Sequence, residues 1–285
     1  MSWRYSNSDA SNSSISSNAQ DLTEAISFIN KRAGELVSEL IQSRGREAPP
    51  FLAKEFAPLV GVRNIVRTNL EEQDGVLLRT TEGYIIKTNA NHHEVRQNFS
   101  CAHEIGHIIL DEFVDQTSSI DFRRQTGVIE KAKERLCDIA AVELLMPAGI
   151  FKKYLSGMGL SIDSVESIAH TFKVSILTTA IRIAEVSSEP CIVIMWKLWQ
   201  KRKTKCLRIA WVAGANRENR QSHFIPRDTC ITKDAKIFKA YETDRSVKSF
   251  KHLNINNQKK RCYVESKGFG FDSNRYVISL VFLNR

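Results

Sequence analysis

Hydrophobic residues recur with a helical period near the start of the chain. Within residues 21–45 they fall on one helical face, at Leu22, Ile26, Ile29, Leu36 and Leu40. Gly45 follows directly and ends the pattern, as glycine commonly does after a helix. We therefore expect a long helix over residues 21–45. The preceding residues 1–20 are rich in Ser and Asn, which predicts a disordered arm.

Short β-type runs and further helical periods follow. A short helix is expected over about residues 51–59. Val76–Thr80 and Tyr84–Thr88 are predicted strands around a turn. Two apolar helices are then expected over about residues 93–110 and 128–145. Residues 161–186 predict two helices broken near Lys173–Ser175, the outline of a helix-turn-helix.

The pattern changes from helical to β after Pro190. Runs of apolar and β-branched residues separated by polar stretches predict strands over residues 191–199, 206–214, 234–241, 260–268 and 275–283. The fold class predicted is therefore α+β. The expected domains are the arm 1–20, a mainly helical core with a small sheet over 21–158, a helix-turn-helix over 159–188, and a β-rich, sensor-like domain over 191–285.

Charge separates the two halves of the chain. The 285 residues carry a formal net charge of +9. Residues 191–285 hold 21 Lys or Arg but only 7 Asp or Glu, so the earlier part is slightly acidic. This basic domain is either a solvated face or a contact for an anionic partner such as DNA.

The apolar segments and the cysteines indicate the cellular compartment. The first residues contain no apolar signal segment, and the apolar run Cys191–Trp196 is too short to span a bilayer. We expect a cytoplasmic protein without a membrane partner. Six cysteines are scattered without a C-x-x-C pair, so all six are predicted to be reduced thiols.

The stretch NFSCAHEIGHIIL carries the candidate chemistry. His103 and His107 lie one helical turn apart, so both imidazoles can reach one ion. Glu104 lies about 100° round the helix from His103, in the general-base position of an H-E-x-x-H site. The alternative is a pair of unconnected core histidines. Burial of three ionisable groups in so apolar a helix is costly without a partner, which favours a metal.

A catalytic zinc site needs a third protein ligand. Position 113 is Phe113, which excludes a third histidine at that spacing, so a glutamate of the next helix is expected. Glu130, Glu134 and Glu143 are candidates. Glu134 is favoured because Asp138, one turn later, can accept the second ring N–H of a ligand histidine, and Glu130 is the main rival. Two His and one Glu make Zn²⁺ the expected ion, with Mn²⁺ as the alternative.

Several blocks together resemble the ImmA/IrrE family of metallopeptidases. The family pattern R-x-x-F-[TS]-x-x-H-E-[LI]-G-H matches at Arg96, Phe99, Ser100, His103, Glu104, Ile105, Gly106 and His107. The pattern E-x-x-A-[ND] followed by E-L-L-M-P matches at Glu134, Asp138, Glu143, Leu144, Leu145, Met146 and Pro147. Two departures stand out: Cys137 replaces the usual alanine, and an aromatic residue is missing near Ile139 and Ala140.

The resemblance covers about residues 50–186 and implies a zincin-like core with a gluzincin-type third ligand. It also implies cleavage of a helix-turn-helix repressor that controls stress-response or mobile-element genes. In such a fold the strand before the motif helix would border the cleft and pair with substrate. That hypothesis assigns substrate contact to Tyr84, Ile85, Ile86, Lys87 and Thr88.

The sequence thus predicts a metal-dependent endopeptidase. His103, His107 and Glu134 would bind the metal, Glu104 would act as general base, and Asp138 would support a ligand histidine. The alternative function is a DNA-binding transcriptional regulator or sensor whose metal site takes no part in proteolysis.

Overall fold

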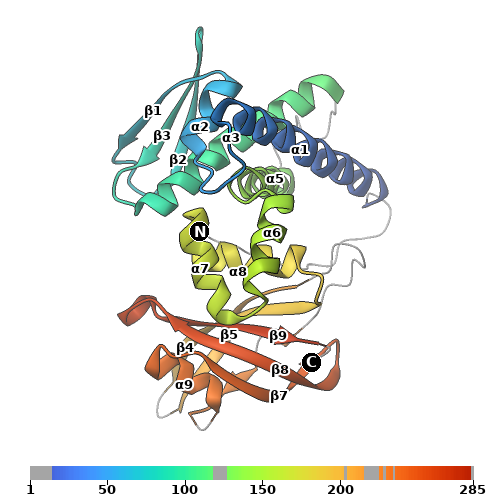
Figure 1. The fold of residues 1–285 in the computed structure, drawn as a ribbon, viewed down its shortest axis with the longest axis vertical. Coiled ribbons are helices and arrows are strands. Elements are labelled where there is room, and N and C mark those ends of the chain that lie inside the picture. Colours follow the sequence, from blue (N-terminus) through green and yellow to red (C-terminus); the bar gives the residue numbers. More distant parts are fainter. Residues whose placement is uncertain are drawn as a thin grey trace. The chain divides into compact units, whose positions relative to one another are not determined.

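The computed structural model describes most of the chain as two compact units (Figure 1). Its described residues are 15–117, 127–201, 204–214, 225–226, 229–233 and 235–283. Within them, residues 15–150 and 171–175 form one unit, here called the N-terminal unit. Residues 151–170 and 176–283 form the C-terminal unit.

The N-terminal unit begins with the long helix α1 (Ile15–Arg44). This helix starts six residues earlier than its apolar period predicts, so residues 15–20 do not belong to an arm. The remaining arm, residues 1–14, lies outside the described residues. Ser and Asn give little periodic signal, which explains why the first helical turns were missed. One face of α1 is buried, including Ile29 and Leu36.

A short helical segment and a three-stranded sheet follow. The segment consists of α2 (Ala53–Phe56) and the 3₁₀ turn η1 (Ala57–Val60), close to the predicted short helix. The sheet contains β1 (Val62–Thr68), β2 (Gly75–Thr80) and β3 (Gly83–Asn89). The predicted hairpin of β2 and β3 is confirmed. Strand β1 was not predicted, because its residues mix polar and apolar types without alternation.

The strand order is β1-β3-β2, which corrects the hypothesis about the cleft edge. Strand β3 pairs with β1 in parallel and with β2 in antiparallel, so Tyr84–Thr88 lies in the middle of the sheet. Its backbone groups are used on both sides and cannot pair with a substrate peptide. Strand β2 is the edge strand on that side. A sequence pattern can predict that two strands form a hairpin. It does not predict which of the two strands also pairs with a third strand.

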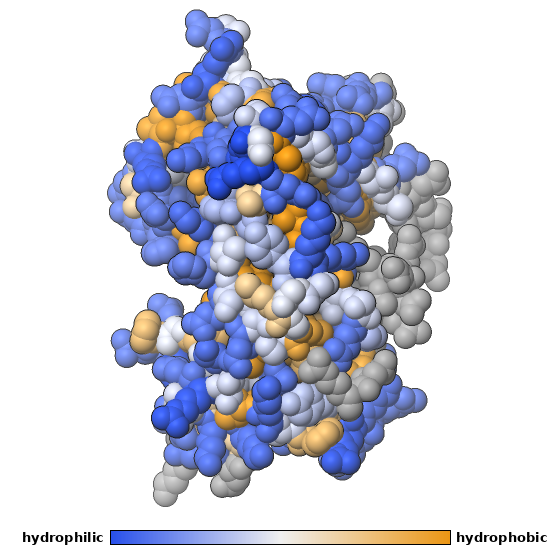
Figure 2. All heavy atoms as spheres, viewed as in Figure 1, coloured by the Kyte–Doolittle hydropathy of each residue, from blue (hydrophilic) through white to orange (hydrophobic). Residues whose placement is uncertain are grey.

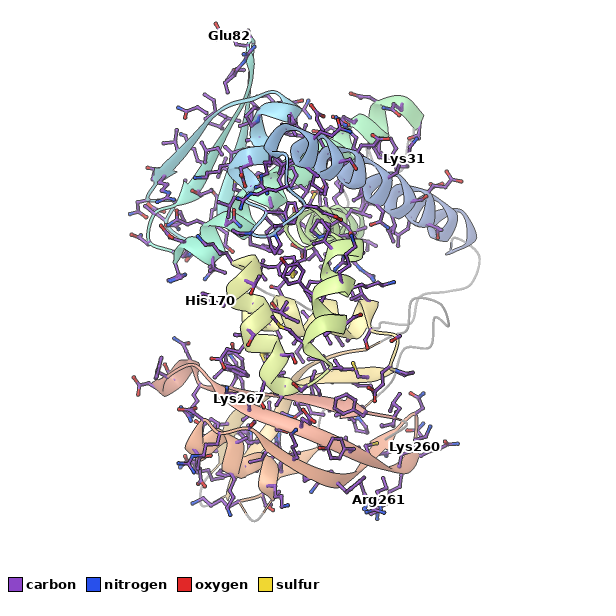
Figure 3. All side chains as sticks on the ribbon, in the orientation of Figure 1. Lys31, Glu82, His170, Lys260, Arg261 and Lys267 are labelled. Atoms are coloured by element: carbon purple, nitrogen blue, oxygen red, sulfur yellow. A yellow bond between two sulfur atoms is a disulfide. The ribbon has the colours of Figure 1, made fainter. Side chains whose placement is uncertain are left out.

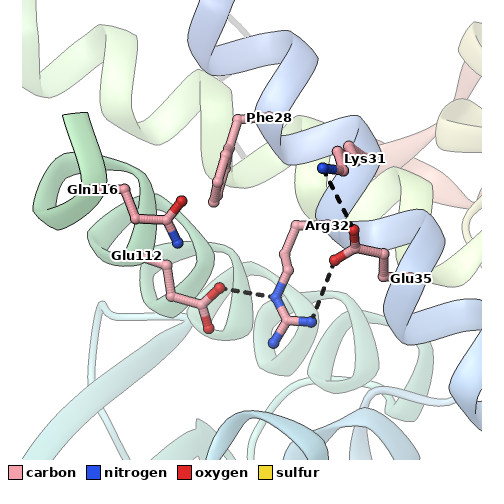
Figure 4. A pocket seen from close by; sticks show the side chains of 6 residues that line it. All are labelled: Phe28, Lys31, Arg32, Glu35, Glu112 and Gln116. Carbon is pink, nitrogen blue, oxygen red and sulfur yellow. Dashed lines mark hydrogen bonds and ion pairs between the residues drawn. The ribbon is translucent and has the colours of Figure 1, made fainter.

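Two helices complete the N-terminal unit and carry the predicted motifs. They are α3 (Glu94–Thr117) and α5 (Gly127–Leu145), and they pack against each other. Helix α3 extends seven residues beyond the predicted end at Leu110. Helix α1 packs on both. Figure 4 shows Arg32 of α1 in a surface hollow, where its Nε donates to Glu112 of α3 at 2.8 Å. Glu35 lies on the other side of the same guanidinium.

Helices and a six-stranded antiparallel sheet build the C-terminal unit. After α6 (Ala148–Met158) come α7 (Ile162–Phe172) and α8 (Ile176–Val186), with the predicted break at Lys173–Ser175. The strands are β4 (Cys191–Lys201), β5 (Thr204–Ala213), β6 (Cys230–Ile231), β7 (Val247–Ile255), β8 (Gln258–Phe269) and β9 (Tyr276–Phe282). Their order in the sheet is β6-β5-β4-β9-β8-β7.

Two predictions for the C-terminal unit are wrong. The expected strand over residues 234–241 is instead helix α9 (Lys236–Thr243), whose Ile237, Phe238 and Ala240 pack on the sheet. An apolar run this short is compatible with either a strand or a helix. The second error concerns the thiols, because Cys206 and Cys230 form a disulfide. They are brought together by the pairing of β5 with β6, which no cysteine spacing reveals.

The helix pair α7–α8 does not expose a base-reading surface on its second helix. Thr178 is 3 % exposed, and Thr179 and Arg182 are fully buried. Helix α8 packs against β4 and β9 of the same unit. These side chains therefore serve packing, and they are not available to read the edges of DNA bases.

The drawn surface is mostly hydrophilic, with hydrophobic residues in scattered groups (Figure 2). The large hydrophobic side chains found exposed in the described part of the chain are Leu78, Val128, Met158, Phe250 and Phe271. No helix among the described residues is both long enough and apolar enough to cross a membrane.

Candidate metal centre

The two histidines of α3 point toward a carboxylate of α5. The Nε2 atom of His103 lies 3.2 Å from one oxygen of Glu134, and Nε2 of His107 lies 3.7 Å from the other. The two imidazole rings are 5.1 Å apart at their centres. Three donor groups from two packed helices therefore converge on one point, as the helical spacing of His103 and His107 predicts.

Asp138 fixes the orientation of one imidazole. Its Oδ1 lies 2.9 Å from Nδ1 of His103. An ionised carboxylate only accepts hydrogen bonds, so Nδ1 is the donor and Nε2 faces Glu134. This places Asp138 where a supporting acid of a metal-bound histidine is normally found. Asp138 and Glu134 are one turn apart on α5, which explains why one helix can supply both groups.

Glu104 is held between α3 and the edge strand β2. Its side chain is 8 % exposed, and the backbone N–H of Leu77 donates to its carboxylate. A Cβ atom on Gly75 would lie 2.8 Å from Oε1 of Glu104, so the strand approaches this carboxylate closely. Burial raises the pKa of Glu104 to about 7, although the nearby His103 opposes that shift. A carboxylate with such a pKa can exchange a proton near neutral pH.

The pKa values of His103, His107 and Glu134 depend on one another. Burial lowers the pKa of His103, but hydrogen bonds to Asp138 and Glu134 outweigh burial and raise the pKa to about 10. Burial and the neighbouring His103 lower the pKa of His107. The hydrogen bond to His103 lowers the pKa of Glu134. The ion pair of His103 with Glu134 therefore favours positive charge at this point of the site.

The alternative third ligands are placed differently. Glu130 forms an ion pair with Lys133 at 3.0 Å, one turn before Glu134. Glu143 lies nine residues after Glu134, which is about 13 Å along the helix axis. Of the three glutamates considered from sequence, Glu134 is the one brought to both histidines.

Sequence reasoning missed Cys137 as a potential donor. The ligand atoms of His103, His107 and Cys137 all lie within 4.8 Å of one another. Cys137 is fully buried, and burial raises the pKa of its thiol well above the usual value. Its position three residues after Glu134 could have drawn attention to it, since i and i+3 share a helix face.

The donor set fits a divalent metal. Two imidazole nitrogens and one carboxylate, with a second acid behind His103, match the ligand chemistry of catalytic zinc sites. The same residues also lie in a stretch that a known family model matches. Residues 63–184 match the family model for peptidase M78, described as the IrrE N-terminal-like domain. This part of the chain is thus similar to the IrrE-type metallopeptidases.

Named relatives support the assignment of this metallopeptidase domain. The radiation response metalloprotease IrrE of Deinococcus deserti is 30 % identical over 111 residues, which is 39 % of this chain and 40 % of that protein. The protein of the same name from Deinococcus radiodurans is 31 % identical over 111 residues, 39 % of this chain and 34 % of that protein. The chain thus matches well under half of the length of either relative.

A solved structure resembles the fold over a larger part of the chain. A Mycobacterium tuberculosis transcriptional regulator superposes with a TM-score of 0.58 and covers 92 % of this chain and 80 % of its own. The sequences are 13 % identical, so the likeness concerns the fold. It extends beyond residues 63–184, which the IrrE-type metallopeptidase model matches.

Proposed function

We propose that the chain is a metal-dependent endopeptidase that cleaves a helix-turn-helix transcriptional repressor. The observation that carries the proposal is the convergence of His103, His107 and Glu134, with Glu104 buried beside them. His103, His107 and Glu134 would hold the ion, with Zn²⁺ as the expected metal and Mn²⁺ as the alternative. When bound, such an ion supplies Lewis acidity toward a carbonyl oxygen and an activated water.

The protein's own groups provide orientation and proton transfer. Glu104 accepts a proton from the attacking water, since its pKa of about 7 suits a base at neutral pH. The Leu77 N–H keeps the Glu104 carboxylate in place. Asp138 holds His103 in the tautomer that presents Nε2 to the ion. Glu104 and Asp138 therefore have separate roles, proton transfer and ligand orientation, and a single substitution can remove either one.

Strand β2 is the proposed contact for the substrate backbone. It pairs with β3 on one side, and on its other side no described strand pairs with it. The Leu77 N–H, which donates to Glu104, belongs to this strand. An extended peptide added to the edge of β2 would therefore run beside the general base.

A cleavage assay with Glu104→Gln tests the proposal. The purified full chain loaded with zinc is incubated with purified helix-turn-helix repressors from the same genome. We expect cleavage by the wild-type protein, loss of at least about a hundredfold in Glu104→Gln, and unchanged zinc content. Glu94→Gln, an exposed glutamate at the start of the same helix, is the matched control. Equal cleavage by the wild-type protein and Glu104→Gln would overturn the catalytic assignment.

One surface favours a second function, contact with DNA. Residues 247–269, which form the β7–β8 hairpin, contain six Lys or Arg and one Glu. Phe250 is 54 % exposed, and the Arg261 guanidinium lies 4.3 Å from the centre of its ring. Lys260 and Arg261 extend outward from this hairpin (Figure 3). Cations beside an exposed aromatic ring suit a nucleic acid backbone and its bases.

Salt-dependent binding to duplex DNA tests this second function with the full chain. Replacement of Lys260 and Arg261 by Glu is expected to weaken binding and to lower the slope against log salt by about one unit per phosphate contact. Lys31→Glu, an exposed lysine of α1, is the control for net charge. Identical salt slopes for all proteins would exclude DNA contact by this hairpin.

A further inference from the structure

Two ion pairs join strand β2 to helix α3. At the start of the strand, Oδ1 of Asp74 lies 2.6 Å from a terminal nitrogen of the Arg96 guanidinium. Toward the end of the strand, the Arg79 guanidinium pairs with the carboxylate of Asp111. On α3, Arg96 and Asp111 lie about two turns before and about two turns after Glu104. The proposed general base therefore lies between the two ion pairs.

The two ion pairs have opposite polarity. At the start of β2 the strand side supplies the anion and the helix supplies the cation, whereas toward its end the strand supplies the cation and the helix the anion. If the strand slid along the helix, both pairs would be lost. If it ran in the opposite direction, like charges would face each other and repel. The pairs therefore favour one alignment of β2 along α3.

Asp74 is itself held in place by neighbouring groups. The Nδ1 atom of His92, in the turn before α3, lies 3.0 Å from the same oxygen of Asp74. Gln97 of α3 donates from its Nε2 to the carbonyl of His92 at 2.6 Å. The N–H of Asn89, a buried residue at the end of β3, donates to the carbonyl of Asp74 at 3.1 Å. Asp74 thus joins the sheet, through its carbonyl, to the start of α3, through its carboxylate.

The contacts that orient Glu104 come from the stretch of β2 between the two ion pairs. Gly75 approaches the Glu104 carboxylate closely, and the Leu77 N–H donates to it. The side chains of Arg79 and Arg96 are 65 % and 41 % exposed, and ion pairs so exposed contribute little to the free energy of unfolding. A displacement of a catalytic group by about 1 Å, in contrast, can lower a rate about a hundredfold. The ion pairs should therefore affect the reaction rate more than they affect stability.

We propose that Asp74 and Arg79 are positioning residues, which hold β2 on α3 so that Gly75 and the Leu77 N–H fix the Glu104 carboxylate. Each residue acts through the strand and not through a contact of its own with the reacting atoms. The expected effect on the rate rests on the proposed function, in which Glu104 is the general base. The attachment of β2 to α3 can be measured without that function.

Cleavage kinetics of the zinc-loaded full chain, with a purified repressor that the wild-type protein cleaves, test the effect on the rate. Asp74→Ala and Arg79→Ala are expected to lower kcat about 10- to 100-fold at unchanged zinc content and melting temperature. Arg79→Lys keeps the charge and should restore part of the rate. The losses in Asp74→Ala and Arg96→Ala should not add in the double variant, because both remove the same contact. Arg32→Ala, which removes an ion pair between α3 and α1, is the matched control and should leave kcat unchanged.

Hydrogen exchange of the metal-free full chain tests the attachment without a substrate. The Leu77 amide should be protected in the wild-type protein, because its N–H donates to a buried carboxylate. Exchange of this amide should be at least about tenfold faster in Asp74→Ala and Arg79→Ala, and unchanged in Arg32→Ala.

The two measurements separate this inference from the proposed function. Unchanged exchange at Leu77, or an unchanged kcat, in both Asp74→Ala and Arg79→Ala would overturn the positioning role. A fall in kcat that only follows a fall in melting temperature would overturn it as well, since general loss of stability would then be the cause. If the wild-type protein cleaves no repressor but Leu77 exchange responds as expected, the proposed function fails and the attachment of β2 by the two ion pairs stands.

Discussion

A Cβ atom on Gly106 would lie 2.8 Å from the Cα atom of Cys137, which makes this glycine the contact that sets the spacing of α3 and α5. The neighbouring His107 and Glu134 face each other across the same helix pair. The distance between these donors therefore depends on the absence of a side chain at position 106.

Gly106→Ala is expected to separate the two helices. The new methyl group would meet backbone atoms that cannot rotate away, so we expect a loss of about 1–3 kcal/mol in the free energy of unfolding. Zinc affinity should fall as well, which metal titration of the folded variant would detect. Gly34→Ala, at a helix position of α1 with nothing within 4 Å of the added carbon, should be neutral or stabilising. Equal behaviour of the two variants would contradict the spacing role.

Glu104→Gln is expected to stabilise the metal-free protein at neutral and alkaline pH. The folded-state pKa of about 7 lies above the ordinary glutamate pKa of 4.5, so the ionised carboxylate is disfavoured by folding. The resulting loss of stability is absent below the unfolded pKa, grows as the pH rises to about 7, and is constant above it. Removing the charge should recover up to about 3 kcal/mol at pH 8.

Thermal unfolding in the presence of a chelator measures this effect. The melting temperature of Glu104→Gln should exceed that of the wild-type protein at pH 8, and the two should converge near pH 4. Glu94→Gln, at an exposed position of α3, should show no such pH dependence. A constant difference between pH 4 and pH 8 would show that burial of the charge is not its cause.

Asp138→Ala is expected to lower metal affinity more than it lowers stability. The variant removes the acceptor that holds Nδ1 of His103 at 2.9 Å, so the imidazole loses its fixed orientation. Loss of such a supporting group weakens metal binding about 10- to 100-fold. Asp138→Asn, whose amide oxygen still accepts a hydrogen bond, should recover part of the affinity. Competition with a chelator of known affinity measures both, and unchanged binding in Asp138→Ala would remove this role.

Gly75→Ala is expected to reduce activity with little effect on folding. Its Cβ atom would lie 2.8 Å from Oε1 of Glu104, which is the end of a flexible side chain and can move aside. The base would then leave the position fixed by the Leu77 N–H. A fall in kcat at an unchanged melting temperature and zinc content is the expected result. A fall in melting temperature instead would mean that the sheet, and not the base, was displaced.

The ion pair of Arg32 and Glu112 is expected to stabilise the N-terminal unit modestly. Its atoms are 2.8 Å apart, and the two side chains are 26 % and 30 % exposed. A double-mutant cycle with alanine at both positions should give a coupling energy of about 1 kcal/mol. Urea unfolding of the wild-type protein, the two single variants and the double variant measures this coupling energy. A coupling energy near zero would show that the ion pair does not stabilise the packing of α1 on α3, and that apolar contacts alone hold the two helices together.

The sequence was most informative where chemistry and helical spacing coincide. His103, His107 and Glu134 could be placed together because i and i+4 positions share a face and because the family pattern adds the second helix. Sheet order could not be inferred in the same way, so residues 84–88 were assigned to an edge that β2 occupies. The Cys206–Cys230 disulfide also depends on strand pairing between distant residues. The proximity of Cys137 to the histidines depends on how α3 and α5 pack at Gly106, and a motif does not state which helix faces meet.

Helix α1 lies outside residues 63–184, yet it packs on both α3 and α5. The segment recognised as homologous is therefore smaller than the structure that must fold around the site. A helix that covers a core needs one apolar face of suitable volume, and many sequences satisfy that demand. The family model thus matches the residues of the candidate metal centre, whereas the helix that covers them has only to supply an apolar face of suitable volume.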